Sequence, residues 1–531
     1  MDPVGTLLDQ ITETLPEDRQ ALRRLKARVA SGSGEPLIRN DRLLARYRLD
    51  VQRGLRPPSQ AVERILTLNG IRSQSGIATV TVITEPYPCP GRCVYCPTEA
   101  QAPKSYLTNE PAVRRALRNA YDPYRQVASR LQALDETGHP IDKIDLIVKG
   151  GTWSFYPDAY QQEFIRRCFE AANEFGEGSR VQGEGGLEEV QRLNETATSR
   201  LIGITIETRP DYINEAQIHR LRQLGVTRVE LGVQSLDERI LELIVRDHTT
   251  AQIRAATRLL RDAGFKVAHH LMPNLPGATP HTDLETMREL FDNPAYRPDA
   301  IKLYPCVVLE TAELLQWWRQ GRYQPYDDQT LVELLIQMKQ LAPPYTRIER
   351  VIRDIPSDSI RAGSRVTNLR EEVHRRMRER GLRCRCIRCR QVRGDAAGTY
   401  TLRRRTYQAG EGLEVFLSFE DAASDRLASL LRLRIPSPTP QGQTHWLPVL
   451  EGAALIRELH TYGRHVPLHR HPEDAVQHQG FGWRLLQEAE RIARDECGRR
   501  RMAVIAGVGV RGYYQRLGYT LQDTYMIKAL T

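Results

Sequence analysis

The sequence predicts an α/β protein: a partial TIM-like barrel, then a cysteine-stapled linker and an α+β domain, with a helical segment at the amino terminus. Six β-rich runs alternate with amphipathic helical stretches such as Glu215–Leu224 and Thr250–Ala263. The runs are Ala78–Thr84, Ile144–Val148, Leu201–Thr205, Arg228–Gly232, Val267–Leu271 and Ala300–Tyr304. This alternation favours a parallel, incomplete barrel, with its chemistry at the carboxyl ends of the strands.

The later part of the chain has a different pattern, which indicates a separate domain. Strands follow from Glu414, a helix runs from about Phe481 to Asp495, and a strand covers Met502–Ala506. We therefore expect four regions. They are a basic helical segment at 1–75, a barrel at 76–345, an arginine-rich linker at 346–405 and the α+β domain at 406–531.

Composition is that of a folded protein with a basic surface. Of the 531 residues, 40% are hydrophobic and 27% are charged, and the net charge is +10, which favours polyanionic partners. The first 15 residues contain acidic groups and no long apolar core, so we expect no signal peptide. No run of about 18 apolar residues occurs, so we expect no membrane span and a cytoplasmic location.

The basic amino-terminal segment has two interpretations. Leu22, Leu25 and Val29 share one helical face, with arginines and a lysine around it. The segment is either a helical cap with a solvated basic face or a surface that contacts phosphate groups.

A first cysteine cluster follows the first predicted barrel strand. Cys89, Cys93 and Cys96 have the spacing C-x₃-C-x₂-C. Three thiolates can hold three irons of a 4Fe–4S cluster and leave the fourth iron open to S-adenosylmethionine (SAM). The alternative is a zinc site that lacks one ligand. The position after the first strand favours the iron–sulfur interpretation and resembles the radical SAM superfamily.

Polar and glycine residues at the ends of the next strands are candidate SAM contacts. Gly150 and Gly151 follow the second strand, where paired glycines let backbone approach a ligand closely. Glu207 and Arg209 follow the third strand and offer polar contacts. The nearby residues Glu230, Gln234, His269 and His270 are expected to pack or to join networks inside the barrel.

A second cluster places Cys384, Cys386 and Cys389 within six residues. Structural zinc takes four ligands, so we expect Cys306 to supply the fourth, with His374 as the second choice. Free thiols in a basic loop are the alternative. The cluster lies in a zone, 353–407, with 16 arginines, 6 acidic residues and no lysine. This zone is either solvated surface or, more in keeping with its charge, a footprint for nucleic-acid phosphates.

The carboxyl-terminal domain contains a glycine loop before a helix. Gln477, Gly480 and Gly482 fit the Q-x-x-G-x-G loop of GNAT acetyltransferases, where free N–H groups at a helix start hold the pyrophosphate of CoA. The strand Ala454–His460 is expected to lie against the pantetheine arm. The segment around Tyr514 resembles the one whose tyrosine contacts the thioester sulfur; a core tyrosine pair is the alternative.

These motifs together resemble the catalytic subunit of Elongator, in its prokaryotic type. They are Cys-Pro-Gly-Arg-Cys-Val-Tyr-Cys-Pro, Gly-Gly-Thr, Ile-Glu-Thr-Arg-Pro-Asp, Glu-Leu-His, His-Gln-Gly-Phe-Gly and Tyr-Tyr-Gln-Arg-Leu-Gly-Tyr. The resemblance implies tRNA as partner, with the basic segment 1–75 binding it. It also implies an electron donor, and action without other Elongator subunits. The implied reaction uses a deoxyadenosyl radical to join the acetyl methyl carbon of acetyl-CoA to carbon 5 of the wobble uridine; hydrolysis then leaves a carboxymethyl group.

The resemblance also assigns residues. Lys149 is implicated in acetyl-CoA handling and catalysis, and Tyr513 and Tyr514 are catalytic. The implied acetyl-CoA contacts are Lys149, Glu458, Leu459, His460, Thr461, Phe481, Gly482, Trp483 and Tyr514. A protein lysine acetyltransferase is the main alternative, which requires a general base and an open peptide groove. A non-catalytic tRNA-binding scaffold is the third.

Overall fold

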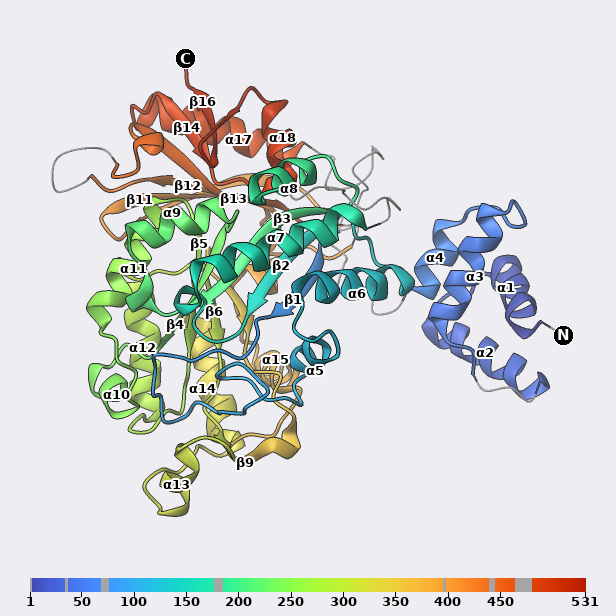
Figure 1. Cartoon of the computed structure of the whole chain (residues 1–531), viewed down its shortest axis with the longest axis horizontal. Coiled ribbons are helices and arrows are strands. Elements are labelled where there is room, and N and C mark those ends of the chain that lie inside the picture. The colour runs from blue at the N-terminus through green and yellow to red at the C-terminus, as the bar shows by residue number, and fades with distance from the viewer. Residues whose placement is uncertain are drawn as a thin grey trace.

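The computed structural model describes residues 2–33, 37–67, 76–175, 185–394, 398–438, 445–463 and 480–531. Figure 1 shows a small helical bundle at one side of a larger body that holds two sheets. The bundle comprises α1 (Pro3–Thr14), α2 (Arg19–Ser33), α3 (Asn40–Gln52) and α4 (Gln60–Leu66). It has its own apolar core, and it contacts the body where Arg48 donates to Asp135 on α6 at 3.0 Å and Thr67 Oγ1 donates to the Gly138 carbonyl oxygen at 3.4 Å. Among the described residues, no helix is long and apolar enough to cross a bilayer.

The central sheet is parallel, as the alternating pattern predicts. Its strand order is β1-β2-β3-β4-β5-β6-β8. The strands are β1 (Ala78–Ile83), β2 (Lys143–Lys149), β3 (Arg200–Thr208), β4 (Arg228–Gln234), β5 (Lys266–Leu271), β6 (Ala300–Leu303) and β8 (Arg347–Arg350). β1 and β8 form the two edges, so the barrel is open between them, as expected.

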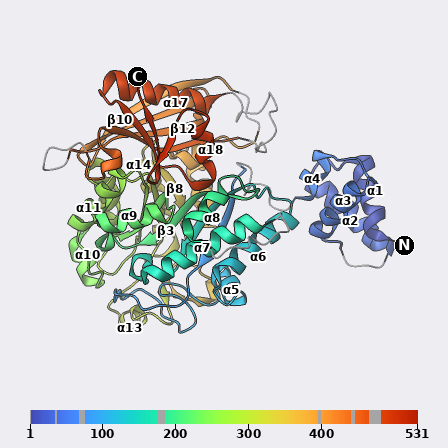
Figure 2. The same cartoon turned by 45° about the horizontal axis from the view of Figure 1, so that its top comes forward.

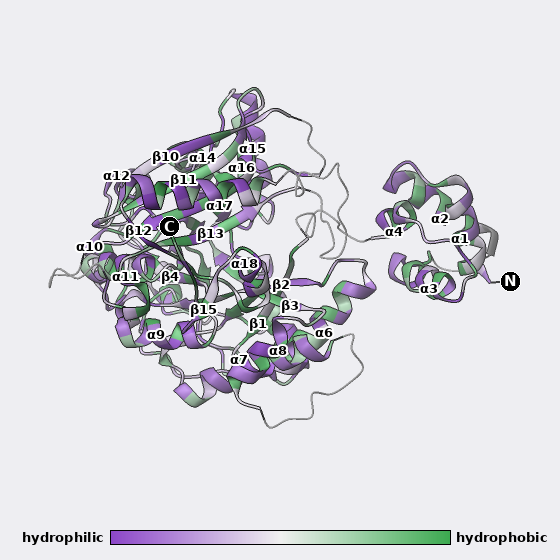
Figure 3. Cartoon of the chain, turned by 90° about the horizontal axis from the view of Figure 1, so that it is seen from above, coloured by the Kyte–Doolittle hydropathy of each residue, from purple (hydrophilic) through white to green (hydrophobic). Residues whose placement is uncertain are grey.

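Helices cover the outside of this sheet. They are α5 (Pro111–Arg118), α6 (Pro123–Glu136), α7 (Asp158–Glu174), α8 (Leu187–Asn194), α9 (Glu215–Gln223), α10 (Glu238–Leu243), α11 (Thr250–Asp262), α12 (Pro280–Asp292) and α14 (Asp328–Leu341). Side-chain caps fix several of their starts: Asn214 caps α9, and Thr249 forms a capping box with Gln252 on α11. Figure 3 shows hydrophilic residues over these outward helices. Their apolar faces pack on the strands in one continuous core.

The second sheet is mainly antiparallel, with the order β10-β11-β12-β13-β14-β16-β15. Its strands are β10 (Tyr400–Ala409), β11 (Gly412–Asp421), β12 (Arg426–Ile435), β13 (Ala453–Thr461), β14 (Arg501–Val504), β15 (Thr520–Gln522) and β16 (Tyr525–Ala529). One neighbouring pair, β13 and β14, is parallel. Helix α17 (Phe481–Arg491), a π-helical turn (Ile492–Glu496) and α18 (Arg511–Gln515) complete this part. Figure 2 shows it lying over the central sheet.

The arginine-rich zone does not form one structural unit. It contains β9 (Ile360–Ala362), which pairs with β7 (Val308–Leu309) near α13 (Leu314–Arg319), and then α15 (Leu369–Glu379) and α16 (Ile387–Arg390). Its last arginines lie on β10, which precedes the first strand expected, at Glu414. The strand β8 also lies within the expected linker, because it completes the central sheet beyond residue 345.

A buried ionic network joins the two sheets. Arg457 on β13 donates to both oxygens of Asp299, beside β6, at 2.7 and 2.8 Å, and also to Glu414 on β11 at 2.8 Å. Arg434 on β12 pairs with Asp262 at the end of α11 at 2.7 Å. The side chains of Arg457, Asp299 and Glu414 are almost wholly inaccessible to solvent. Buried charges are tolerated only when paired, so these pairs fix how the two sheets meet.

Candidate functional site

A cavity of about 1560 Å³ runs through the interior of the open barrel. It is lined at the carboxyl ends of the strands by Cys89, Cys93 and Cys96, and at their amino ends by His460 and Tyr514 of the second sheet's domain. The sequence therefore brings its first cysteine cluster and its expected thioester site to one continuous space.

The first cysteine cluster lies in the loop after β1. Cys89 Sγ is 3.6 Å from Thr152 Oγ1, and Cys93 Sγ accepts a hydrogen bond from Arg246 at 3.4 Å. Burial and the neighbouring thiols raise the pKa of Cys96 to about 12, so a cationic group is needed to hold it as a thiolate. The sulfurs of Cys89, Cys93 and Cys96 do not all lie within 4.8 Å of one another. Three half-buried thiols spread along one cavity wall fit a multi-iron cluster better than a single ion.

The expected SAM contacts line the same end of the cavity. Gly150 leaves room for Thr84, whose Oγ1 is 1.9 Å from the position a Cβ would take, whereas Gly151 faces nearly open space. Glu207 is already engaged: it accepts from Tyr106 at 2.7 Å and pairs with Lys149. Gly151 therefore leaves space for a ligand, and Glu207 offers a carboxylate held in a fixed orientation.

Arg209 does not extend freely into the cavity. Its guanidinium pairs with Asp211 through two hydrogen bonds of 2.9 Å. Its remaining nitrogen, Nη1, is buried and has no hydrogen-bond partner in the described structure. That nitrogen lies over Gly91, within the cysteine loop. The structure thus places Arg209 beside the cysteine loop, in the lining of the same cavity as Gly150 and Gly151.

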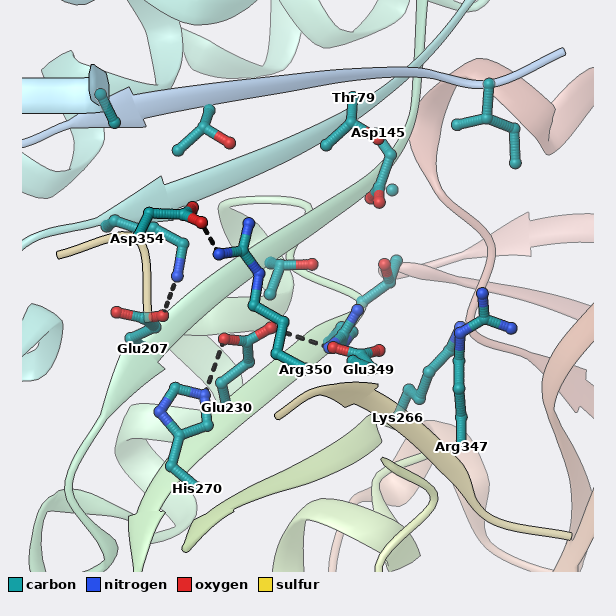
Figure 4. A pocket seen from close by; sticks show the side chains of 18 of the residues that line it. Thr79, Asp145, Glu207, Glu230, Lys266, His270, Arg347, Glu349, Arg350 and Asp354 are labelled. Carbon is teal, nitrogen blue, oxygen red and sulfur yellow. Dashed lines mark hydrogen bonds and ion pairs between the residues drawn. The ribbon is translucent and has the colours of Figure 1, made fainter. Parts of the chain in front are cut away.

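Ion pairs line the middle of the cavity (Figure 4). Glu230 on β4 contacts His270 at 2.9 Å and Arg228 at 2.8 Å, and also pairs with Lys302. Burial alone would raise the pKa of Glu230, but Lys302 and Arg228 hold it well below its usual value. Glu207, Glu230 and His270 come within 4.8 Å of one another, yet lysine ammonium groups already neutralise both carboxylates. This group therefore does not need a metal ion.

Lys149 is placed as a charged hydrogen-bond donor rather than a base. Burial alone would lower its pKa, but Glu207 and Tyr106 keep the pKa well above the usual lysine value. The ammonium group lies at the end of β2, in the cavity wall. It stays charged at neutral pH and can orient an oxygen atom of a ligand.

The opposite end of the cavity is built on β13. The ladder between β13 and β14 ends at the Ile456–Val504 pair, so β13 continues without this partner to Thr461. Glu458 is held by Lys266 at 2.6 Å and by Arg432 at 2.8 Å. Leu459 packs against the apolar core of the second sheet. A strand edge released in this way offers free backbone groups to an extended ligand.

Two polar side chains follow on the same strand. Thr461 Oγ1 is 2.8 Å from Ser429 Oγ on β12. His460 Nε2 is buried without a hydrogen-bond partner in the described structure. Burial, together with Lys266 and Arg347, lowers the pKa of His460 to about 4, so the ring is neutral at neutral pH. His460 can therefore accept a hydrogen bond from a ligand in the cavity.

Helix α17 begins beside this strand. Gly480 takes the left-handed conformation at its start, with φ of +68°. A Cβ on Gly482 would lie 3.7 Å from both Thr461 Oγ1 and Tyr513 Oη, so these groups converge there. Phe481 stacks on Phe419 in the core, and the Trp483 side chain is exposed. The expected contact at Gln477 lies outside the described residues.

The two tyrosines differ in burial. Tyr514 is buried and lines the cavity, while Tyr513 packs edge-on against it, with ring centroids 5.1 Å apart. Burial raises the pKa of Tyr514, so its phenol is protonated at neutral pH. Of the pair, Tyr514 is therefore the one placed to donate a proton or hydrogen bond into the cavity.

The second cysteine cluster is compact. The sulfurs of Cys384, Cys386 and Cys389 lie within 4.8 Å of one another, as ligands of one ion would. Cys306 does not join them, which corrects the expectation for the fourth ligand. Its chain leaves β6 toward a different apolar cluster, where Cys306 is buried with Tyr323. His374, the second choice, has its Nε2 3.8 Å from Cys389 Sγ.

The arginine-rich zone divides into paired and cavity-facing residues. Arg375 and Arg376 pair with Glu372 on the same helix, and Arg390 pairs with Glu420. Others line the cavity: Arg353, Arg370, Arg388 and Arg393. Five further basic residues contribute to the site but stand in no recognisable sequence motif, so they could not be identified from the sequence: Arg228, Arg246, Lys266, Lys302 and Arg347.

Comparisons with known proteins agree with this architecture. The Radical SAM superfamily matches residues 87–290, and the Radical_SAM C-terminal domain matches residues 298–379. A protein of Methanocaldococcus infernus, the archaeal Elp3 solved with an amino-terminal deletion, superposes with a TM-score of 0.74 at 39% identity. That match covers 86% of this chain and 100% of the other.

Curated relatives match over nearly the same span. The tRNA uridine(34) acetyltransferase of Dehalococcoides mccartyi is 47% identical over 86% of this chain and 99% of its own. The protein of that name from Methanocaldococcus jannaschii is 38% identical over 99% and 97%. Human Elongator complex protein 3 is 41% identical over 87% and 85%. With its parallel half-barrel and these relatives, the chain belongs to the family of tRNA uridine(34) acetyltransferases and Elongator complex protein 3, as a radical SAM protein of the prokaryotic type.

Proposed function

We propose that this chain modifies the wobble uridine of tRNA by adding a carboxymethyl group, derived from acetyl-CoA, to carbon 5. The relatives' names point to uridine 34 of tRNA as the target. The observation that carries the proposal is the single cavity with Cys89, Cys93 and Cys96 at one end and Tyr514 at the other. A nucleobase at the cysteine end and an acetyl-CoA arm that enters from the Tyr514 end would meet inside that cavity.

The cysteine end would hold the radical-forming group. A 4Fe–4S cluster on Cys89, Cys93 and Cys96, with SAM at its open iron, supplies a carbon-centred radical able to remove hydrogen from a methyl group. The Gly150–Gly151 backbone would bind the amino-acid part of SAM, and Glu207 would accept a hydrogen bond from it. Lys149, held charged by Glu207, would orient the acetyl oxygen.

The second domain would hold acetyl-CoA. The strand order and the parted β13–β14 pair support a GNAT-like domain from about residue 406 on. The pantetheine arm would lie along Glu458, Leu459, His460 and Thr461 by way of their backbone. The start of α17, at Gly480, Phe481, Gly482 and Trp483, would hold the pyrophosphate, with Gln477 beside it.

Tyr514 lies at the other end of the cavity from Lys149, so the thioester would move there before hydrolysis. Tyr514 would then protonate the leaving sulfur when water cleaves the thioester, and Tyr513 would orient Tyr514. Overall, the methyl carbon would lose one hydrogen atom to the deoxyadenosyl radical and bond to carbon 5 of the uridine, and carbon 5 would lose its own hydrogen as a proton while one electron returns to the iron–sulfur site. Hydrolysis of the thioester would then give a carboxylate and a free thiol. We further propose that the chain works without other Elongator subunits and takes electrons from a separate donor.

Zinc and tRNA contacts complete the proposal. Cys384, Cys386, Cys389 and His374 would hold a structural zinc ion that pins the linker at 346–405 to the barrel. The cavity-facing arginines and the basic helical bundle at 1–75 would contact tRNA phosphates.

The decisive experiment is anaerobic reconstitution with iron, sulfide, SAM, acetyl-CoA, a reductant and tRNA, followed by nucleoside mass spectrometry. We expect carboxymethyluridine with the intact chain and none with Cys93→Ser. Tyr514→Phe should lower acetyl-CoA hydrolysis about 10²- to 10⁴-fold, as loss of one proton donor does.

The alternative, protein lysine acetylation, predicts a different result. An acetyltransferase of that kind would modify lysine peptides without SAM and without stimulation by tRNA. Two results together would overturn the proposed function: acetylated peptide in a reaction without SAM and tRNA, and unmodified nucleosides in the complete reconstituted reaction.

A further inference from the structure

Two buried arginines converge on the first cysteine loop. Arg246 donates from Nη1 to Cys93 Sγ at 3.4 Å, and Arg209 reaches Gly91 in the same loop. Arg246 is 7% exposed and Arg209 is 4% exposed. We call Arg209 and Arg246 the arginine pair. The two side chains are linked, because Arg209 also donates to the carbonyl oxygen of Asp247 at 3.2 Å.

Two glycines make room for the arginine pair. A Cβ on Gly232 of β4 would lie 2.6 Å from Arg246 Nη2, which donates to the Gly232 carbonyl oxygen. A Cβ on Gly91 would lie 2.5 Å from Arg209 Nη1 and 3.6 Å from Cys93 Sγ. Contacts this short are incompatible with any larger residue unless the guanidinium moves. Each arginine therefore reaches the cysteine loop only because a glycine faces it.

The backbone around Arg246 is held in an unusual conformation. Val245 and Asp247, on either side, both have positive φ, of +53° and +57°. A β-branched residue such as valine rarely adopts this conformation, which costs free energy that the surrounding structure must offset. A backbone hydrogen bond joins this turn to the cysteine loop: Val94 N donates to the Ile244 carbonyl oxygen at 3.2 Å.

Only one member of the arginine pair has a carboxylate partner in the described part of the chain. Asp211 pairs with Arg209, and Arg246 has no carboxylate within ion-pair distance in the described part of the chain. His248 also lies close, but burial and Arg246 lower its pKa to about 2, so it is neutral. A buried cation of this kind calls for an anion, and the sulfur atoms supply the nearest site for it.

We propose that the arginine pair sets the reduction potential of the iron–sulfur site through the positive charge it places against Cys93. This inference rests on the proposed iron–sulfur site. An added electron makes that site more negative, so a fixed buried cation stabilises the reduced form and raises the potential. The pair thus makes it easier for the electron donor to prepare the site for SAM. Arg246, which contacts the sulfur directly, contributes more than Arg209.

The test is an electron paramagnetic resonance redox titration of the reconstituted full-length protein, without SAM, acetyl-CoA or tRNA. For Arg246→Gln we expect the equilibrium constant for one-electron reduction to fall about tenfold, which corresponds to a reduction potential about 59 mV more negative. Arg209→Gln should shift it in the same direction by less. Arg239→Gln is the matched control, because Arg239 lies on nearby α10 with its side chain 85% exposed and should leave the potential unchanged.

Gly232→Ala provides a second test that keeps every charge in the chain. Its methyl group would displace the Arg246 guanidinium, so we expect a negative shift here too. An Arg246→Gln potential equal to that of Arg239→Gln would overturn the inference. Should Arg246→Gln fail to hold iron, an unchanged potential in Gly232→Ala would overturn it instead.

The outcome is separable from that of the proposed function. Shifted potentials in a protein that yields no modified nucleoside would support the role of the arginine pair and contradict the proposed reaction. The opposite result is also possible: the unsubstituted chain yields carboxymethyluridine, while Arg246→Gln and Gly232→Ala leave the reduction potential unchanged. That result would support the proposed reaction and contradict the role of the arginine pair.

Discussion

The two cysteine clusters share a C-x₂-C step but have very different surroundings. Cys89, Cys93 and Cys96 lie in an irregular loop at the wall of a large cavity, with a buried arginine on the middle sulfur. Cys384 and Cys386 lie with Cys389 in a compact group against the barrel core. Spacing along the chain therefore indicates that sulfurs gather, but the surrounding fold decides whether the site is open for chemistry or closed for support.

Cys93→Ser should have the largest effect on activity and a small one on stability. Removing a ligand from the open cluster should abolish SAM cleavage. The rate of cleavage should fall by at least about 10⁶-fold, which is the lower end of enzymatic rate enhancement over an uncatalysed reaction. The thermal midpoint should change by only a few degrees, since Cys93 lies in a loop. Chromatographic detection of deoxyadenosine gives the first value and calorimetry the second. Retained SAM cleavage would remove the distinction between the two clusters.

Cys386→Ala should show the reverse pattern. Its sulfur is buried, and losing a structural metal ligand should lower the free energy of unfolding by about 3 kcal/mol or more. SAM cleavage per folded molecule should persist. Denaturant unfolding with and without a chelator measures the effect, and Cys497→Ala, at a half-buried thiol away from both clusters, is the control. A chelator that destabilises Cys386→Ala as much as the intact chain would contradict a metal at this site.

His374→Ala should weaken zinc binding without removing it. The imidazole lies 3.8 Å from Cys389 Sγ, and three thiolates would remain as ligands. We expect about a 10- to 100-fold loss of zinc affinity, measured by competition with a chromophoric chelator. Zinc affinity equal to that of the intact chain would show that another group completes the shell.

Cys306→Ser should have the smallest effect. Cys306 lies in the apolar cluster around Tyr323, apart from both sets of sulfurs. Zinc and iron content, measured by plasma emission spectrometry, should stay at the level of the intact chain. A fall in zinc content would restore the ligand assignment that the structure corrects.

The same contrast explains what the sequence could predict. The six barrel strands are apolar runs with helices between them, so their periodicity is plain, and their bounds agree within a few residues. β8 was missed because Arg347-Ile-Glu-Arg contains one apolar residue, and its other side chains face the charged cavity. β10 was missed because its arginines read as a linker, whereas they lie on an edge strand with charged side chains.

Site residues divide in a similar way. Cysteine and glycine motifs are local, so their members could be named from spacing. Arg246 could not, because its role depends on a turn that brings residue 246 against residue 93. The Cys306 assignment failed for the same reason: its place after β6 is local information, and the direction of the following chain is not. Glu458 was expected at acetyl-CoA, yet Lys266 and Arg432 occupy its carboxylate, which leaves its backbone for that purpose.

The ionic network of Asp299, Arg457 and Glu414 has a consequence for motion. Parting the two sheets would strip several charges of their partners at once, at a cost of about 3–5 kcal/mol for each broken pair. Thermal fluctuation therefore does not open a hinge between the two sheets, and the distance between the cysteine loop and Tyr514 stays fixed. A ligand that spans the cavity would therefore bind to a frame whose two ends keep their separation.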